Sequence, residues 1–282
     1  MYTFFVATDF SKAAENATRY AAQLAQKINA NLILFHIATH KEASGPGRVS
    51  ATHLQICLEK LENQALAIAD EYKLHCKPVI GLSHSTESIM AEAEKEVADI
   101  IIMGITAAPR LEKGILGSKT QDLICKGTIP VLAIPENMKF HAITKIVLAV
   151  GTHTPDYGML QKLVRFASVF HAHIELIHIH HGKEKIDSPY LETSDLIKKT
   201  GYQKISCTVI KGEDTAKELD RHLHLKNASL LVIIRKHLGL FQDVFSGLAG
   251  RMTYVSDVPL LVFNEEEFNI GQLGVKEEEI LG

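Results

Sequence analysis

Tryptophan is absent from this 282-residue chain, and cysteine is scarce. The four thiols, Cys57, Cys76, Cys125 and Cys207, have neither a CxxC spacing nor a secretory context, which favours reduced structural cysteines over a disulfide framework. No apolar run approaches the ~18 residues of a membrane span. The N-terminal stretch becomes acidic too soon for a signal peptide. We therefore expect a cytoplasmic protein with no membrane partner.

The chain also lacks an excess of charge of either sign. Its formal net charge is −3, and charged residues make up 22% of the sequence, so bulk electrostatics predicts no nucleic-acid partner. The apolar fraction of 46% is ordinary for a globular protein. A chain of 282 residues is long for one compact α/β unit and natural for two units of ~140 residues each.

Short apolar runs alternate with segments of helical periodicity in the first half. The predicted strands are 2–8, 32–37, 76–80, 100–103 and 131–134, and the predicted helices between them begin near residues 11, 51, 85 and 118. This alternation is typical of an α/β fold in which a parallel sheet carries helices on both faces.

The second half repeats the pattern of the first. The matching segments are 145–150 with 3–8, 172–179 with 30–37, 207–212 with 76–81, 230–233 with 100–103, and 258–263 with 129–134. A repeat of this length indicates a duplicated domain. We predict an N-terminal domain at 1–138, a linker near 136–144, a C-terminal domain at 143–264 and an acidic tail at 265–282.

The stretch from Ala98 to Pro135 organises the first half. An apolar strand ends at Gly104, where we expect a loop to begin, and a capping box follows at Ser118-Lys119-Thr120-Gln121. A strand, a glycine loop and a helix N-terminus suit phosphate, because free N–H groups and the positive end of the helix dipole converge there. Neither a P-loop nor a dinucleotide fingerprint fits the spacing.

This stretch resembles the nucleotide-binding signature of the universal stress protein family: glycine, two residues, glycine, nine residues, glycine, then serine or threonine. Gly104 supplies the first glycine, Ala107 replaces the second, and Gly117-Ser118 supplies the last pair. Further pieces that resemble the family are VATDFS at 6–11, LFHIA at 34–38, ADIIIMG at 98–104 and PVLAIP at 130–135. The resemblance implies, for each half, a Rossmann-like, adenine-nucleotide alpha-hydrolase-like fold: two tandem five-stranded parallel sheets of strand order 3-2-1-4-5.

The resemblance also implies a set of nucleotide-binding residues. In nucleotide-binding members, the position of Asp9 contacts the adenosine end, and the backbone at the position of Ile37 lies beside the adenine. Met103 and Gly104 end the fourth strand at the same edge. The residues implied around the phosphates are Ala107, Gly117, Ser118, Lys119 and Thr120.

Each of these residues also has a purely structural interpretation. Asp9 suits the turn into the first helix, where it would help to satisfy free N–H groups. Ile37 is otherwise an ordinary strand residue. Helix capping alone accounts for Ser118, although it does not account for the spacing from Gly104.

The second half has lost most of the signature. Gly151 stands in the place of Asp9, Ile234 replaces Gly104, and His237 replaces Ala107. Gly247 keeps the position of Gly117, but Leu248 follows it in place of a hydroxyl residue. We therefore expect nucleotide in the first half only.

A run of histidines in the second half raises the question of a metal site. The residues are His171, His173, His178, His180 and His181. The two-residue period of a strand puts His178 and His180 on one face and His173 on the other, which argues against a zinc site. We predict no bound metal.

The sequence leaves two functional hypotheses open. The first is a tandem universal stress protein that binds ATP or AMP in its N-terminal domain and acts in the stress response through protein partners not yet identified. The second is a nucleotide-free scaffold or dimerisation module with the same fold, and Ala107 is the residue that separates the two.

An enzyme is the least favoured interpretation. The chain has no SGGxDS loop, no HIGH or KMSKS signature and no nucleophile with an adjacent base. Slow ATP hydrolysis, which some family members show, stays open.

The predicted strand order leaves one apolar strand at an edge of each half. These strands, 131–134 and 260–263, would be exposed if each half stood alone. We therefore predict that the two halves pack as an intrachain pseudo-dimer through these strands. A homodimer of the whole chain stays open.

Overall fold

The computed structural model describes residues 2–38, 50–82, 85–106, 120, 122–124, 127–151, 157–181, 193–235, 248, 252 and 257–264. In chain order the elements are β1 (Thr3–Thr8), α1 (Lys12–Ile28), β2 (Asn31–Ile37), α2 (Ala51–Tyr72), β3 (Cys76–Gly81), α3 (Thr86–Lys95), β4 (Ile100–Ile105), β5 (Val131–Pro135), β6 (Lys145–Val150), α5 (Tyr157–Phe170), β7 (His173–His180), α6 (Thr193–Thr200), β8 (Ile205–Lys211), α7 (Thr215–Leu225), β9 (Leu230–Arg235) and β10 (Leu260–Asn264).

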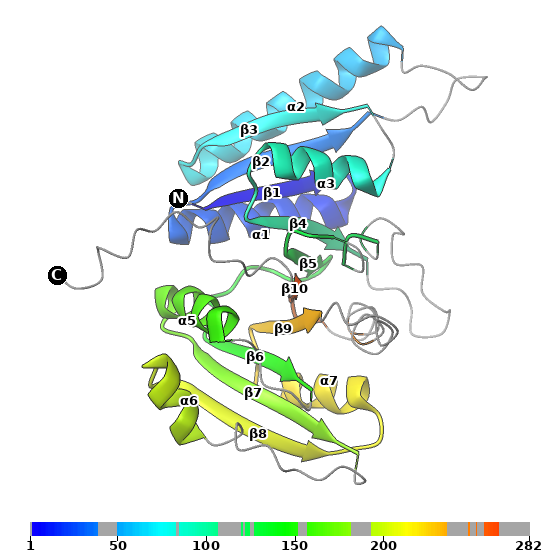
Figure 1. Ribbon diagram of the computed structural model, residues 1–282. Helices are drawn as coiled ribbons and strands as arrows, with labels where there is room; N and C mark the ends of the chain where they lie inside the picture. Colours follow the sequence, from blue (N-terminus) through cyan, green and yellow to red (C-terminus); the bar gives the residue numbers. More distant parts are fainter. Residues whose placement is uncertain are drawn as a thin grey trace, which may run out of the picture.

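The strands form one ten-stranded sheet in the order β3-β2-β1-β4-β5-β10-β9-β6-β7-β8, which Figure 1 shows fanned from β3 at the top to β8 at the bottom. Within each half the order is the predicted 3-2-1-4-5 with parallel neighbours. Both predicted five-stranded sheets are present, and they are joined edge to edge. Strands β5 and β10 pair antiparallel, with Leu132 opposite Leu261, and this pairing joins the two sheets.

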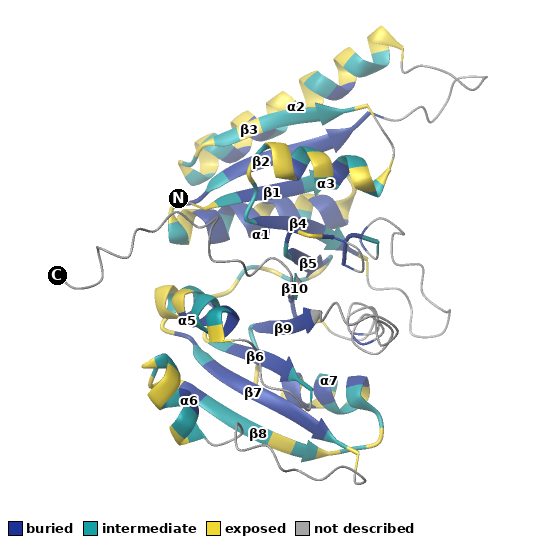
Figure 2. Cartoon of the chain, viewed as in Figure 1, coloured by how far each residue is buried: buried dark blue, intermediate teal, exposed yellow. Residues whose placement is uncertain are grey.

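Helices cover both faces of the sheet, as the alternation predicted. One face, which we call the α1 face, packs against α1, α2, α5 and α6, and the other, the α7 face, packs against α3 and α7. Alternation along β1 supplies both layers, because Phe4 and Val6 lie in the α1 face and Phe5 lies in the α7 face. Figure 2 shows the central strands buried and the outer sides of the helices exposed.

Strand ends differ from the predictions by one or two residues, and one difference concerns the site. Gly104 was expected to begin a loop, but it lies inside β4, opposite Ile134 of β5. The strand continues to Ile105 because β5 offers partners as far as Pro135. The helix predicted to begin near residue 85 spans Thr86–Lys95, with Ser85 as its N-cap.

The duplication is visible in the capping of matching strands. Asp99 accepts a hydrogen bond from the Thr3 N–H at 2.7 Å, and the matching Ser229 hydroxyl accepts one from the Lys145 N–H at 3.4 Å. Positive φ angles recur as well, at Val97 (52°) and at its counterpart Asn227 (49°). The proposed boundaries at 138 and 143 fall between β5 and β6, and they stay a prediction.

None of the described helices is both long enough and apolar enough to cross a membrane.

Candidate functional site

The carboxyl ends of β1, β2 and β4 lie side by side at one edge of the N-terminal half. Since β1 pairs with both β2 and β4, the strand ends carrying Ile37, Met103 and Gly104 flank the turn that contains Asp9. Ligands of open α/β sheets bind outside this edge. The structure therefore brings four of the predicted site residues together.

The remaining predicted residues divide into two groups. Thr120 is helical and buried, with 4% of its surface exposed. Ala107, Gly117, Ser118 and Lys119 lie outside the described residues, as does Gln121 of the predicted capping box.

Asp9 is exposed and belongs to the turn into α1. Its Oδ1 accepts a hydrogen bond from the Ser11 N–H at 2.9 Å, and the Ser11 hydroxyl accepts one from the Ala14 N–H at 3.3 Å. Partial burial acts to raise the pKa of the Asp9 carboxyl. Hydrogen bonds from Ser11 and the nearby His36 outweigh that effect and hold the pKa below its usual value. The side chain thus makes the structural contact that the sequence suggested, and it presents a carboxylate at the edge.

Three side chains that sequence reasoning did not include in the site stack beside Asp9. Phe10 has a positive backbone φ of 61°. The centroid of its ring lies 4.3 Å from that of the His36 ring, and the Lys60 Nζ lies 4.1 Å from the Phe10 ring centroid. The His36 Nδ1 is 2.8 Å from the carbonyl oxygen of Thr8, and burial lowers the pKa of its imidazole. A cation over an aromatic ring is favourable by about 0.5–2 kcal/mol.

Of these three residues, only His36 could have been singled out from the sequence, through the repeat. His36 aligns with His178, whose Nδ1 likewise lies 3.3 Å from a strand-end carbonyl, that of Val150. Lys60 comes from α2, fifty residues beyond Phe10, and no local pattern links the two.

Gly104 is required by packing, whether or not a ligand binds. A Cβ at this position would lie 2.2 Å from the Ala13 carbonyl oxygen and 2.8 Å from the Ala14 nitrogen, both in the first turn of α1. Only glycine permits this close approach of the helix to β4. The glycine therefore fixes where the N-terminus of α1 lies relative to the edge.

The matching edge of the C-terminal half lacks these features. Gly151 supplies no carboxylate, and the side chain of Ile234, 7% exposed, fills the position of Gly104. Leu248 is buried as well. His237 and Gly247 lie outside the described residues.

The described part of the chain offers neither a metal-binding cluster nor an activated thiol. No group of three or more His, Cys, Asp or Glu side chains there could hold a metal ion. Cys57, Cys76 and Cys207 are free thiols. Burial raises the pKa of Cys76 to about 12 and that of Cys207 to about 11, so both stay protonated near neutral pH.

Comparisons with known proteins agree with this architecture. Two universal stress proteins of Methanocaldococcus jannaschii are similar to the chain. One is 27% identical over 141 residues, a match that covers 48% of this chain and 82% of that protein's length. The other is 28% identical over 148 residues, a match that covers 45% of this chain and 90% of that protein's length.

A solved structure extends the likeness over both halves. The crystal structure of a universal stress protein from Archaeoglobus fulgidus matches with a TM-score of 0.74 at 12% identity, over 93% of this chain and 98% of that one, which shows a common fold. A model of the Universal stress protein family matches residues 1–135. The N-terminal half of the chain is therefore similar to members of the universal stress protein family.

Proposed function

We propose that the chain is a nucleotide-binding stress-response protein that holds ATP or AMP at the carboxyl edge of its N-terminal half and acts through protein partners. The observation that carries the proposal is the convergence of Asp9, Ile37 and Gly104 at adjacent strand ends, in a half that matches the family. In this assignment the nucleotide is bound and not chemically changed.

The roles follow the position of each residue. The Asp9 carboxylate accepts hydrogen bonds from the adenosine end, and the backbone at Ile37 lies along the adenine. Gly117, Ser118, Lys119 and Thr120 hold the phosphates, since a helix N-terminus supplies free N–H groups and a favourable dipole. Met103 belongs to the same edge.

The second candidate, a nucleotide-free scaffold, rests on the same residues. Gly104 is explained by its contact with Ala13, and Asp9 by its hydrogen bond to Ser11. Ala107 also departs from the glycine of the signature, where a Cβ could crowd a phosphate. A binding measurement separates the two candidates.

The decisive experiment is calorimetric titration of the intact chain with ATP and with AMP. We expect one site per chain. Asp9→Asn keeps an oxygen for the Ser11 N–H and removes only the charge. We expect it to weaken binding about ten- to a hundredfold, equivalent to about 1.5–3 kcal/mol for a lost charge-assisted hydrogen bond.

A matched pair of glycine variants tests the location. Gly117→Val should block binding through steric bulk near the phosphates, and Gly247→Val, at the same position of the C-terminal half, should leave it unchanged. A stoichiometry of two, or tight binding by Gly117→Val, would place the site elsewhere. If no nucleotide binds the purified chain, the scaffold is the better assignment, and Ala107→Gly is the first variant to test for a gain of binding.

A further inference from the structure

A carboxylate interrupts the apolar layer of the C-terminal half. Strand β7 presents Ile177 and Ile179 to the α7 face, but two residues earlier on the same face it presents Glu175, which is 4% exposed. This residue has no part in the proposed nucleotide site, which lies in the other half.

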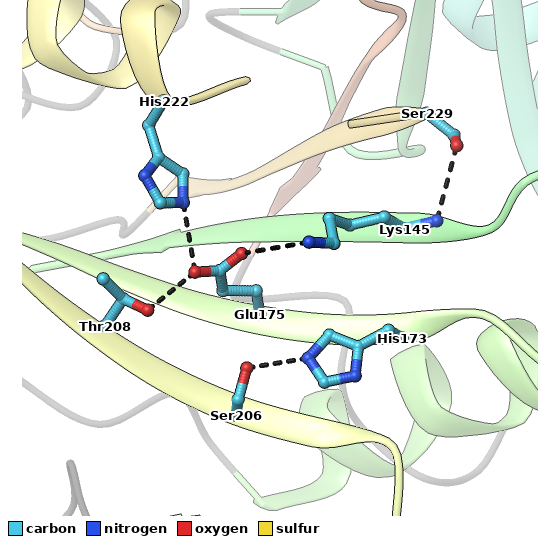
Figure 3. Close-up of polar contacts among 7 residues, drawn as sticks. All are labelled: Lys145, His173, Glu175, Ser206, Thr208, His222 and Ser229. Carbon is cyan, nitrogen blue, oxygen red and sulfur yellow. Dashed lines mark hydrogen bonds and ion pairs between the residues drawn. The ribbon is translucent and has the colours of Figure 1, made fainter. Parts of the chain in front are cut away.

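Side chains from three other elements converge on this carboxylate (Figure 3). Its Oε1 accepts hydrogen bonds from the Thr208 hydroxyl of β8 at 2.6 Å and from the His222 Nε2 of α7 at 3.1 Å. Its Oε2 lies 3.8 Å from the Lys145 Nζ of β6. The side chains of Glu175 and His222 are each only 6% exposed, so the pair is shielded from solvent.

The surroundings favour the charged form of Glu175. Burial acts to raise the pKa of this carboxyl, but the hydrogen bond from Thr208 and the charges of His222 and Lys145 outweigh it and hold the pKa below its usual value. Two further titratable groups lie near it, His173 on the same face of the sheet and Cys207 on the opposite, α1 face. His173, on the same strand, has a pKa lowered by burial, and Cys207 of β8 has a pKa raised to about 11.

The N-terminal half shows what the same position looks like without a charge. Ile33 occupies the place of Glu175 and belongs to the apolar layer under α3. Glu92, the counterpart of His222, forms an ion pair with Lys95 of the same helix. The attachment of α3 at this point is therefore apolar, whereas that of α7 passes through a buried charge.

We propose that Glu175, His222 and Lys145 form an acid-released latch that fastens α7 to the sheet. When the carboxylate takes up a proton, Lys145 loses its counter-charge and His222 its charged acceptor. Breaking one member of a buried ion network is strongly destabilising, because the remaining charge is left without compensation. Opening of α7 then uncovers the apolar surface formed by Ala216, Leu219 and Leu223.

The direction with pH follows from linkage. Since the folded pKa of Glu175 is lowered, the latch stabilises α7 fully above the carboxyl's ordinary value of 4.5 and is lost as the pH falls through the folded value. In that window, uptake of one proton on opening raises the opening equilibrium by up to about tenfold per pH unit.

Hydrogen exchange of the intact chain, read by mass spectrometry from about pH 7 to about pH 3, tests the latch. After correction for intrinsic rates, we expect peptides from α7 to lose protection by up to about tenfold per pH unit in the acidic window. Peptides from α3 should keep theirs over the same range. Loss of protection by both helices at the same pH would overturn the proposal.

Variants make the test specific to Glu175. Glu175→Gln removes the titration and should lower α7 protection at neutral pH without a further fall on acidification. Glu175→Ile combined with His222→Leu copies the apolar arrangement under α3, and it should keep α7 protected and independent of pH. Glu218→Gln, on the same helix but paired at the surface with Arg221, should behave like the wild type. An α7 profile in Glu175→Gln identical to that of the wild type would also overturn the latch.

Discussion

Gly104 and Ile234 occupy matching positions in the two halves, and their difference decides how closely a helix approaches the sheet. At Gly104 the backbone of Ala13 lies where a Cβ would be, whereas Ile234 fills that space with a buried side chain. A first glycine that a nucleotide signature requires is therefore also a packing residue. Its presence alone does not distinguish a binding domain from a scaffold.

We predict that Gly104→Ala destabilises the protein by about 1–3 kcal/mol, because neither the Ala13 carbonyl nor the strand can move without disturbing the core. The free energy of unfolding from urea denaturation measures the effect. Gly212→Ala is the matched control: the three atoms nearest its Cβ all belong to the side chain of Glu218 and none to the backbone, so we expect a smaller loss. Equal losses in the two variants would contradict the role of the Ala13 backbone.

The site could be predicted from the sequence only where it follows from strand ends. Asp9, Ile37 and Met103 lie at one edge because parallel strands in a βαβ alternation finish on the same side. The contact between Phe10 and Lys60 joins two elements fifty residues apart, and no local periodicity contains that information. The packing role of Gly104 could likewise not be predicted from the sequence, since it depends on where the first turn of α1 lies.

At the scale of elements, Asn16 ties α1 to the end of β5 and the segment that follows it. Its side-chain amide donates hydrogen bonds to the carbonyl oxygens of Pro135 at 3.0 Å and Met138 at 2.8 Å. This one side chain therefore helps to fix the point at which the chain leaves the N-terminal half.

We expect Asn16→Ala to lower the free energy of unfolding by about 1–3 kcal/mol, because it removes two hydrogen bonds and takes the Asn16 donor from the partly buried Met138 carbonyl. The Pro135 carbonyl keeps a hydrogen bond from the Met138 N–H at 2.9 Å. Thermal or urea denaturation provides the measurement. Gln55→Ala removes an exposed amide that bonds only to Glu59 of the same helix, and should change stability by less than about 0.5 kcal/mol. A loss for Asn16→Ala no greater than that for Gln55→Ala would show that the tie contributes nothing.

Apolar runs located the strands well but ended β3, β4 and β5 one or two residues too early, because a strand stops where its neighbours stop offering hydrogen bonds. Strand β4 reaches Ile105 for this reason. The repeat also did not predict helix length: α6 spans Thr193–Thr200, whereas α2, in the corresponding connection, spans Ala51–Tyr72. Connections between strands that recur in both halves are free to differ, since the strand order constrains only their ends.

At the scale of the whole molecule, the joining of two sheets protects two apolar edges at once. Val131, Leu132 and Ala133 pair antiparallel with Val262, Leu261 and Leu260. These six residues are between 0% and 4% exposed. The sequence identified both strands and predicted their pairing, and the structure confirms that they meet. The unit of folding at this seam is therefore the pair of halves, because each would otherwise present an unsatisfied apolar strand to solvent.

A fragment of residues 1–140 tests this dependence. Without β10, the backbone groups and apolar side chains of β5 are exposed, so we expect the fragment to form a homodimer through β5 or to aggregate. Size-exclusion chromatography with light scattering, followed over a dilution series, measures the outcome. Adding a fragment of residues 141–264 should replace the homodimer with a one-to-one complex, because it restores the native antiparallel partner. A fragment 1–140 that stays soluble and monomeric at all concentrations, with native-like circular dichroism, would show that the N-terminal half does not need the seam to protect its edge.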